Sequence, residues 1–245
     1  MALVNSWENQ GNFLFKYRGQ FPVILFVLAV PFLYYSNQPS SFEKQVWNYI
    51  ALSGSVIGFL IRFYTIGTTP KGTSGRNTKE QIADYLNSTG IYSAVRHPLY
   101  LGNFLIWTGI AIFTYNIYFI VIMNLLFWIY YERIMFAEER FLERKFGEEY
   151  IIWSKSIPAF FPSFKNYTKT IIPFSVKSVL RREYAGVLST VIGFVFVEVV
   201  REFFKNKEIS DSPFYRNILI VTILVVLVLR ILKHHTKILD EKDRS

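Results

Sequence analysis

The sequence predicts an all-α, polytopic membrane protein with about six transmembrane helices and an amphipathic cytoplasmic cap. Hydrophobic residues make up 51% of the 245 residues, and these include 24 Phe and 16 Tyr. Mean hydropathy is positive, at +0.25. This much apolar surface exceeds what a water-facing fold buries, so a soluble class is excluded.

Six windows rich in Leu, Ile, Val and Phe are each near the length that crosses roughly 30 Å of hydrocarbon. They are Phe21–Tyr35, Val46–Thr65, Leu99–Phe113, Ile117–Tyr131, Ala185–Val200 and Asn217–Leu232. Only Thr114, Tyr115 and Asn116 separate the third window from the fourth, so these two are expected to form a tight antiparallel hairpin. We expect a membrane core over residues 1–165 and a C-terminal helical extension with two further spans over residues 166–245.

The basic residues predict an orientation in the membrane. Lys and Arg together number 27, and the net charge is +9. With a cytoplasmic N-terminus, few basic residues fall on the outer side, namely Lys44, Arg201, Lys205, Lys207 and Arg216. The positive-inside rule therefore predicts an inner-membrane protein with both termini, and the active site, facing the cytoplasm. The basic residues flank apolar runs, which favours anionic lipid head groups over nucleic acid as their partner.

Several residue types limit the chemistry. The chain has no cysteine, which excludes disulfides, thiolate metal sites and cysteine nucleophiles. Its histidines are His97, His234 and His235, and we expect no metal site because the last two follow the final window as flank residues. Glu198 is expected at a solvated helix end, because Arg201 and Glu202 lie beside it. The oligomeric state stays open.

A basic motif precedes the third window. It reads Arg96-His97-Pro98-Leu99-Tyr100-Leu101-Gly102. Pro98 suits the first position of a helix, and a helix N-terminus presents free N–H groups that attract a carboxylate or phosphate. The guanidinium of Arg96 adds a fork of donors for the same kind of group.

The expected hairpin returns an acidic pair to this motif. At 1.5 Å per residue, a helix that starts near Asn116 comes back to the level of His97 near Arg133, Glu138 and Glu139. Opposite charges would then meet at one depth and match a zwitterionic amino acid moiety. The spacing leaves open which of Glu138 and Glu139 is used.

The next segment is typical of an amphipathic helix at a membrane interface. Apolar residues recur at helical spacing among charges, at Phe141, Leu142, Phe146 and Tyr150. A break is expected near Gly147. Such a helix would cap a ligand pocket.

The ordered combination of these features resembles the isoprenylcysteine carboxyl methyltransferase and phospholipid methyltransferase superfamily over about Gly90–Phe164. The resembling pattern is Arg96-His97-Pro98-x-Tyr100-x-Gly102, a short hairpin, then Glu138-Glu139-x-x-Leu142-x-x-x-Phe146-Gly147-x-x-Tyr150, ending in Ile157-Pro158 and Pro162. The resemblance implies S-adenosylmethionine as cofactor and a membrane lipid as substrate. It implies a cofactor site formed by Arg96, His97, Tyr100, Gly102, Glu138, Glu139 and Tyr150. It also implies catalytic roles for Arg96, Glu138 and Glu139.

A second loop, Gly67–Thr78, looks like the bacterial branch that includes lipid A phosphate O-methyltransferases. Its glycines, hydroxyls and two cations, Lys71 and Arg76, suit a phosphate. The most specific prediction is therefore methyl transfer to a lipid A phosphate oxygen. An isoprenylcysteine-type carboxylate or a phospholipid amine is the alternative acceptor, and a small transporter or membrane scaffold is the non-enzymatic alternative.

Overall fold

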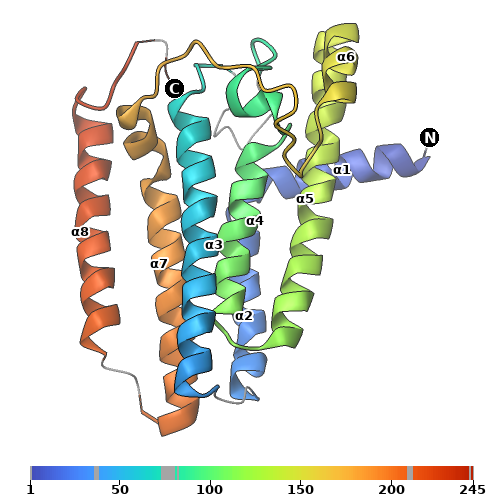
Figure 1. Cartoon of the computed structure of the whole chain (residues 1–245). Helices are drawn as coiled ribbons and strands as arrows, with labels where there is room; N and C mark the ends of the chain where they lie inside the picture. Colours follow the sequence, from blue (N-terminus) through green and yellow to red (C-terminus); the bar gives the residue numbers. More distant parts are fainter. Residues whose placement is uncertain are drawn as a thin grey trace.

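The computed structural model describes residues 2–35, 39–72, 81, 83–208, 212–242 and 244, and the regular elements in this part of the chain are all helices. Helices α2 (Phe21–Tyr34), α3 (Ser41–Gly67), α4 (Pro98–Ile112), α5 (Ile117–Phe146), α7 (Val176–Asn206) and α8 (Pro213–His235) run side by side in Figure 1. Helix α1 (Ala2–Lys16) lies across one end of this bundle. Both chain termini lie at that same end, together with the start of α4.

Three of the described helices, α3, α5 and α8, are long and apolar enough to cross a membrane. Helix α4 is apolar but has 15 residues, and α2 has 14, whereas a spanning helix takes about 20. Helix α7 has 31 residues but carries charges near both ends. The all-helical class is confirmed, while the count of about six spans stays a prediction for α2, α4 and α7.

Small residues allow α3 and α4 to pack backbone against backbone. A Cβ atom on Gly58 would lie 2.5 Å from the carbonyl oxygen of Gly102, and one on Gly109 would lie 2.4 Å from that of Ala51. Ser55 crosses the same seam and donates to the carbonyl of Ile106 at 3.2 Å. Small residues at such interfaces are how membrane helices gain close packing. The seam holds the start of α4 next to the end of α3.

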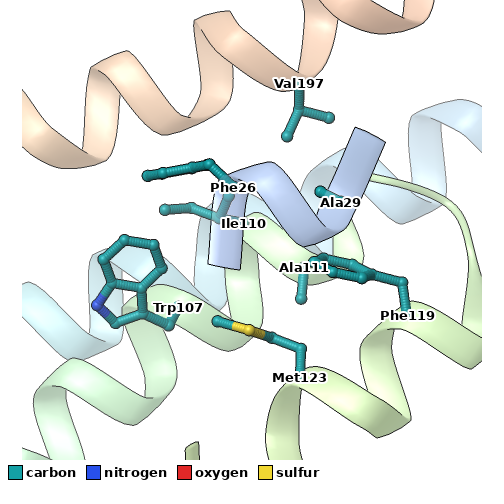
Figure 2. Close-up of a pocket in the computed structure, with 8 residues that line it drawn as sticks. All are labelled: Phe26, Ala29, Trp107, Ile110, Ala111, Phe119, Met123 and Val197. Atoms are coloured by element: carbon teal, nitrogen blue, oxygen red, sulfur yellow. The ribbon is translucent and has the colours of Figure 1, made fainter. Parts of the chain in front are cut away.

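The predicted hairpin between α4 and α5 is confirmed. Tyr115 takes a left-handed conformation in the connection, with φ of 59°. The side chain of Asn116 caps α5 by accepting from the backbone N–H of Phe119 at 3.1 Å. Figure 2 shows a small pocket lined by apolar side chains from α2, α4, α5 and α7, namely Phe26, Ala29, Trp107, Ile110, Ala111, Phe119, Met123 and Val197.

Helix α5 is longer than expected. The residues predicted to form a separate interfacial helix from Glu138 are instead its last turns, because no Gly or Pro interrupts the sequence from Ile117 to Phe146. The predicted break at Gly147 is confirmed: its φ of 54° ends α5 and begins α6 (Glu148–Ser156). A cytoplasmic location for this cap stays a prediction.

Helix α1 was not among the expected elements. It packs on the last part of α5, where a Cβ on Gly11 would lie 2.1 Å from the carbonyl oxygen of Arg133. Glu8 pairs with Arg144 at 2.6 Å, and the guanidinium of Arg133 lies 3.7 Å from the ring centroid of Trp7. Charge and close packing therefore fix α1 on α5.

The expectation of a solvated helix end at Glu198 is wrong. Glu198 forms an ion pair with Arg201, and their side chains are 9% and 0% exposed. Arg201 also donates to the carbonyl of Phe113 at 2.7 Å and lies 4.3 Å from the ring centroid of Tyr115. The pair is buried because the hairpin connection covers it.

Helix α7 contacts α2, α3 and α4. The division of the chain into a core and an extension at residue 165 stays a prediction.

Candidate functional site

The basic motif lies at the start of α4. His97 is the residue that precedes the helix, and Pro98 occupies its first turn as expected. The backbone N–H groups of Arg96 and His97 donate to the carbonyls of Pro158 and Ala159 at 2.9 and 3.2 Å. The start and the end of the superfamily pattern are thus joined by backbone hydrogen bonds between positions 62 apart in the chain. His97 is buried.

The acidic pair of α5 meets this motif directly. Nε2 of His97 lies 2.9 Å from Oε1 of Glu139, and its Nδ1 lies 3.6 Å from Oε2 of Glu138. The hydroxyl of Tyr100 donates to Oε1 of Glu138 at 2.8 Å. Nε of Arg96 lies 3.2 Å from Oε1 of Glu139. We call these five residues, Arg96, His97, Tyr100, Glu138 and Glu139, the polar cluster.

The polar cluster favours a protonated histidine. Burial of the imidazole opposes its charged form, but hydrogen bonds and charges from Glu138 and Glu139 outweigh burial, so the pKa of His97 lies above its usual 6.5. The imidazolium and Arg96 then offset the two carboxylates. Opposite charges are therefore nearly balanced in the cluster.

Helix α6 adds polar groups whose hydrogen-bonding capacity is not used. Nε1 of Trp153 is buried and lacks a hydrogen-bond partner among the described residues, and the buried hydroxyl of Tyr150 lies beside Glu139 without a hydrogen bond of ordinary geometry. Burial and the charge of Glu139 raise the pKa of Tyr150, so its hydroxyl keeps its proton as a donor. An unsatisfied buried donor costs about 1–3 kcal/mol, which a bound ligand with acceptor atoms would recover.

The remaining sequence candidates lie apart from the polar cluster. A Cβ on Gly102 would lie 2.5 Å from Cγ of Arg62, so the packing of α3 on α4 accounts for this glycine. Lys71 is exposed in a turn after α3. Arg76 lies outside the described residues, so its predicted role has no structural counterpart here. The guanidinium of Arg133 stacks on the ring of Trp7 in α1.

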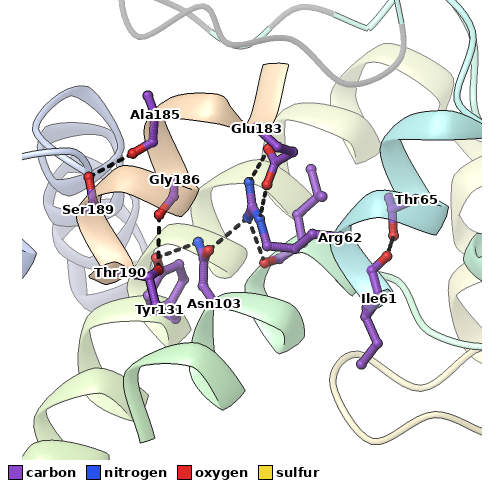
Figure 3. A network of polar contacts seen from close by, with 11 residues as sticks. Ile61, Arg62, Thr65, Asn103, Tyr131, Glu183, Ala185, Gly186, Ser189 and Thr190 are labelled. Atoms are coloured by element: carbon purple, nitrogen blue, oxygen red, sulfur yellow. Dashed lines mark hydrogen bonds and ion pairs between the residues drawn. The ribbon is translucent and has the colours of Figure 1, made fainter. Parts of the chain in front are cut away.

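Sequence reasoning missed a second polar group beside the cluster, which Figure 3 shows. Arg62 of α3 donates to both carboxylate oxygens of Glu183 in α7, each at 2.7 Å. It also donates to Oδ1 of Asn103 at 2.7 Å, and Asn103 donates to the hydroxyl of Tyr131 at 2.9 Å. The available signal was a single arginine inside an otherwise apolar window, which is typical of a functional residue.

Bundle, hairpin and polar cluster together define a helical membrane protein with a candidate ligand site at one end of the bundle. Residues 47–149 match the family model described as phospholipid methyltransferase. This stretch includes all five residues of the polar cluster. The match and the fission yeast relative described next support the superfamily that the motif indicates.

Three curated proteins are similar to parts of the chain. The nickel-cobalt-cadmium resistance protein NccN of Alcaligenes xylosoxydans xylosoxydans is 36% identical over 89 residues, which cover 36% of this chain and 39% of NccN. The protein-S-isoprenylcysteine O-methyltransferase of Schizosaccharomyces pombe is 26% identical over 114 residues, or 44% of this chain and 48% of the enzyme. The cobalt-zinc-cadmium resistance protein CzcN of Cupriavidus metallidurans is 34% identical over 82 residues, or 34% of this chain and 38% of CzcN.

The chain thus spans less than half the length of each of these relatives. No solved structure matches the chain. Within the described residues, no group of three or more His, Asp or Glu side chains is arranged to hold a metal ion.

Proposed function

We propose that this protein is an S-adenosylmethionine-dependent methyltransferase that acts on an acidic group of a membrane lipid. The observation that carries the proposal is the polar cluster, in which Glu138 and Glu139 meet Arg96, His97 and Tyr100 within 2.8 to 3.6 Å. The match of residues 47–149 to phospholipid methyltransferases supports it, because the same stretch contains the cluster.

The residues present fit the amino acid end of S-adenosylmethionine. The guanidinium of Arg96 and the buried donors of Tyr150 and Trp153 suit a carboxylate. Glu138 and Glu139 have acceptor oxygens that suit an ammonium group. When bound, the cofactor supplies a methyl group on a positively charged sulfur.

The protein's own task in such a reaction is alignment. An ionised phosphate or carboxylate is already a nucleophile, so no residue need act as a general base. Alignment at near-attack distance supplies roughly 7–11 kcal/mol of barrier lowering. Glu138 and Glu139 are already held by His97 and Tyr100, which fixes their orientation before any ligand arrives.

The acceptor that we favour is a lipid A phosphate oxygen. This finer proposal rests on the resemblance of the Gly67–Thr78 loop, with Lys71 and Arg76 as the phosphate-binding cations. The names of the matching family and of the yeast relative favour a phospholipid amine or an isoprenylcysteine-type carboxylate instead. An amine must lose a proton before it attacks, so a basic group in the pH–rate profile would indicate that alternative.

We also propose an inner-membrane location with both termini and the site on the cytoplasmic side. The arrangement in Figure 1 supports this proposal, because both termini lie at the end of the bundle where α4 begins. The distribution of Lys and Arg then assigns that side to the cytoplasm.

The test is incubation of membranes containing the protein with methyl-labelled S-adenosylmethionine, followed by mass spectrometry of the extracted lipids. We expect one methyl mass increment on lipid A phosphate. An increment on an ethanolamine amine or a prenylcysteine carboxylate would replace the acceptor and keep the enzyme class. No labelled lipid, together with no binding of the cofactor in detergent, would reject the enzyme and favour a transporter or scaffold.

Matched variants connect that activity to the polar cluster. Arg96→Ala and Glu138→Ala are expected to abolish labelling while the protein still inserts. Glu149→Gln is the control, because Glu149 is an exposed glutamate in the first turn of α6. Labelling at the wild-type rate by Arg96→Ala or Glu138→Ala would reject the assignment of the site.

A further inference from the structure

The ion pair between Arg62 and Glu183 connects the candidate site to a helix outside the stretch that matches the family model. Glu183 lies in α7, whereas the match ends at residue 149. Both charged side chains are largely buried, with exposures of 14% for Arg62 and 2% for Glu183. A buried ion pair inside a bundle is costly to desolvate, so its presence calls for a reason beyond stability.

The contacts of Arg62 lead from α7 toward the polar cluster. Its Nη1 donates to the carbonyl of Leu99 at 3.3 Å and to Oδ1 of Asn103 at 2.7 Å, both in the first two turns of α4. Figure 3 shows the guanidinium between the side chains of Glu183 and Asn103. Leu99 lies between His97 and Tyr100 in the motif. The hydrogen bond from Arg62 therefore stabilises the first turn of α4, which carries these two side chains.

The next contacts run through two tyrosines. Asn103 donates to the hydroxyl of Tyr131 at 2.9 Å, and the rings of Tyr131 and Tyr100 pack with centroids 4.8 Å apart. Tyr100 in turn donates to Glu138 at 2.8 Å. A continuous series of side-chain contacts therefore leads from Glu183 to Glu138. It connects α7, α3, α4 and α5.

We propose that Arg62 and Glu183 are positioning residues, which set the orientation of Tyr100 and Glu138 from outside the family-like stretch and make α7 a working part of the site. This inference rests on the proposed methyl transfer. The fork of Arg62 is essential to it, because a bidentate contact with Glu183 fixes the guanidinium plane and so leaves Nη1 aimed at α4.

An apolar double replacement separates positioning from stability. Removing one partner leaves a buried charge, so Arg62→Met and Glu183→Leu alone are each expected to lower the unfolding midpoint by roughly 10 °C. The double variant Arg62→Met/Glu183→Leu removes both charges and should recover most of that loss. We expect its kcat for methyl transfer to stay reduced by roughly 100-fold, because Asn103 and Tyr131 lose their anchor. Wild-type kcat in a double variant of wild-type stability would overturn the proposal.

Conservative replacements and controls sharpen the result. Arg62→Lys keeps the charge but not the fork, so kcat should fall while the KM for the lipid changes little. Arg181→Met is the control on α7, because Arg181 forms its ion pair with Asp240 near the surface and not with a residue of α3. Equal losses from Arg62→Lys and Arg181→Met would also overturn the proposal.

A spectroscopic measurement tests the inference without turnover. In protein labelled with ¹³C at the tyrosine ζ carbon, the resonance of Tyr100 is expected to shift in Glu183→Gln and to stay in place in Arg181→Met. An unmoved Tyr100 resonance in Glu183→Gln would overturn the positioning role. If the Tyr100 resonance shifts in Glu183→Gln as expected but the wild type transfers no methyl group, the proposed function is rejected and the coupling stands.

Discussion

His97 and Glu139 are 42 positions apart in the chain, and their side chains meet at 2.9 Å, between Nε2 and Oε1. This contact depends on the tight turn between α4 and α5, which returns α5 to the level at which α4 begins. It joins a helix N-terminus, a buried imidazole and a carboxylate in one place. The predictions below follow from this arrangement and from the packing that maintains it.

The first prediction concerns the carboxylate of Glu139. Glu139→Gln keeps the size of the side chain but removes the charge that faces His97 and Arg96, so the affinity for S-adenosylmethionine is expected to fall by roughly tenfold or more. Titration calorimetry in detergent measures this affinity. Glu149→Gln, on the exposed side of α6, should bind like the wild type. Equal affinities for all three proteins would contradict a role for Glu139.

The second prediction concerns pH. The pKa of His97 is raised above 6.5 because the hydrogen bonds and charges of Glu138 and Glu139 outweigh burial. A group with a raised pKa in the folded state binds its proton more tightly there, so its contribution to stability is complete below about pH 6.5 and is lost as the pH rises through the raised value. The unfolding midpoint of the wild type should therefore decline over that range.

His97→Gln supplies the comparison for this prediction. It lacks the titrating group, so its midpoint should be lower at acid pH and should change less with pH than that of the wild type. Thermal unfolding at a series of pH values in one detergent measures both slopes. Parallel curves for the two proteins would show that His97 is not held in its charged form.

The third prediction concerns the seam between α3 and α4. A Cβ on Gly102 would lie 2.5 Å from Cγ of Arg62 and 2.8 Å from the carbonyl oxygen of Gly58, so Gly102→Ala is expected to cost about 1–3 kcal/mol. Gly54→Ala in the same seam meets only the carbonyl of Leu105 at 3.7 Å, an ordinary contact, and should be neutral or stabilising by up to about 1 kcal/mol. Unfolding midpoints in detergent distinguish the two. A harmless Gly102→Ala would contradict the close approach.

The fourth prediction concerns the opposite end of the bundle. Glu198→Gln leaves the buried guanidinium of Arg201 without its ion pair partner, at an expected cost of about 3–5 kcal/mol. Glu202→Gln is the control, because Glu202 is a neighbouring glutamate whose bond to Asn206 is exposed. Thermal unfolding should show a large decrease for the first variant only. Similar decreases in both would mean that the Glu198–Arg201 pair is not buried in the protein.

The hairpin and the polar cluster were predictable because their determinants are local. Three polar residues between two apolar windows leave room only for a tight turn, and helical rise then fixes the level at which Glu139 returns to His97. The break at Gly147 was predictable for a similar reason, since glycine at a helix end relieves a strained backbone.

The polar pairs between distant helices were not predictable in this way. Hydropathy records that Arg62 lies in an apolar stretch, but it does not record that Glu183, 121 positions later, accepts from it. Glu198 is a second example. The charged residues next to it in the sequence indicated a solvated helix end, but the α4–α5 connection covers it in the structure. Helix α1 was missed because a search for long apolar windows does not detect a short helix that is apolar on one face only, and its contacts with α5 explain its position.

The central claim is that the polar cluster binds the methyl donor and that the protein transfers its methyl group to a membrane lipid. The most direct measurement is transfer of labelled methyl from S-adenosylmethionine to extracted lipids by the wild type, Glu138→Ala and Glu149→Gln, assayed in parallel. We expect equal labelling of one acidic lipid by the wild type and Glu149→Gln and none by Glu138→Ala. Absence of labelled lipid with the wild type, or undiminished labelling with Glu138→Ala, would contradict it.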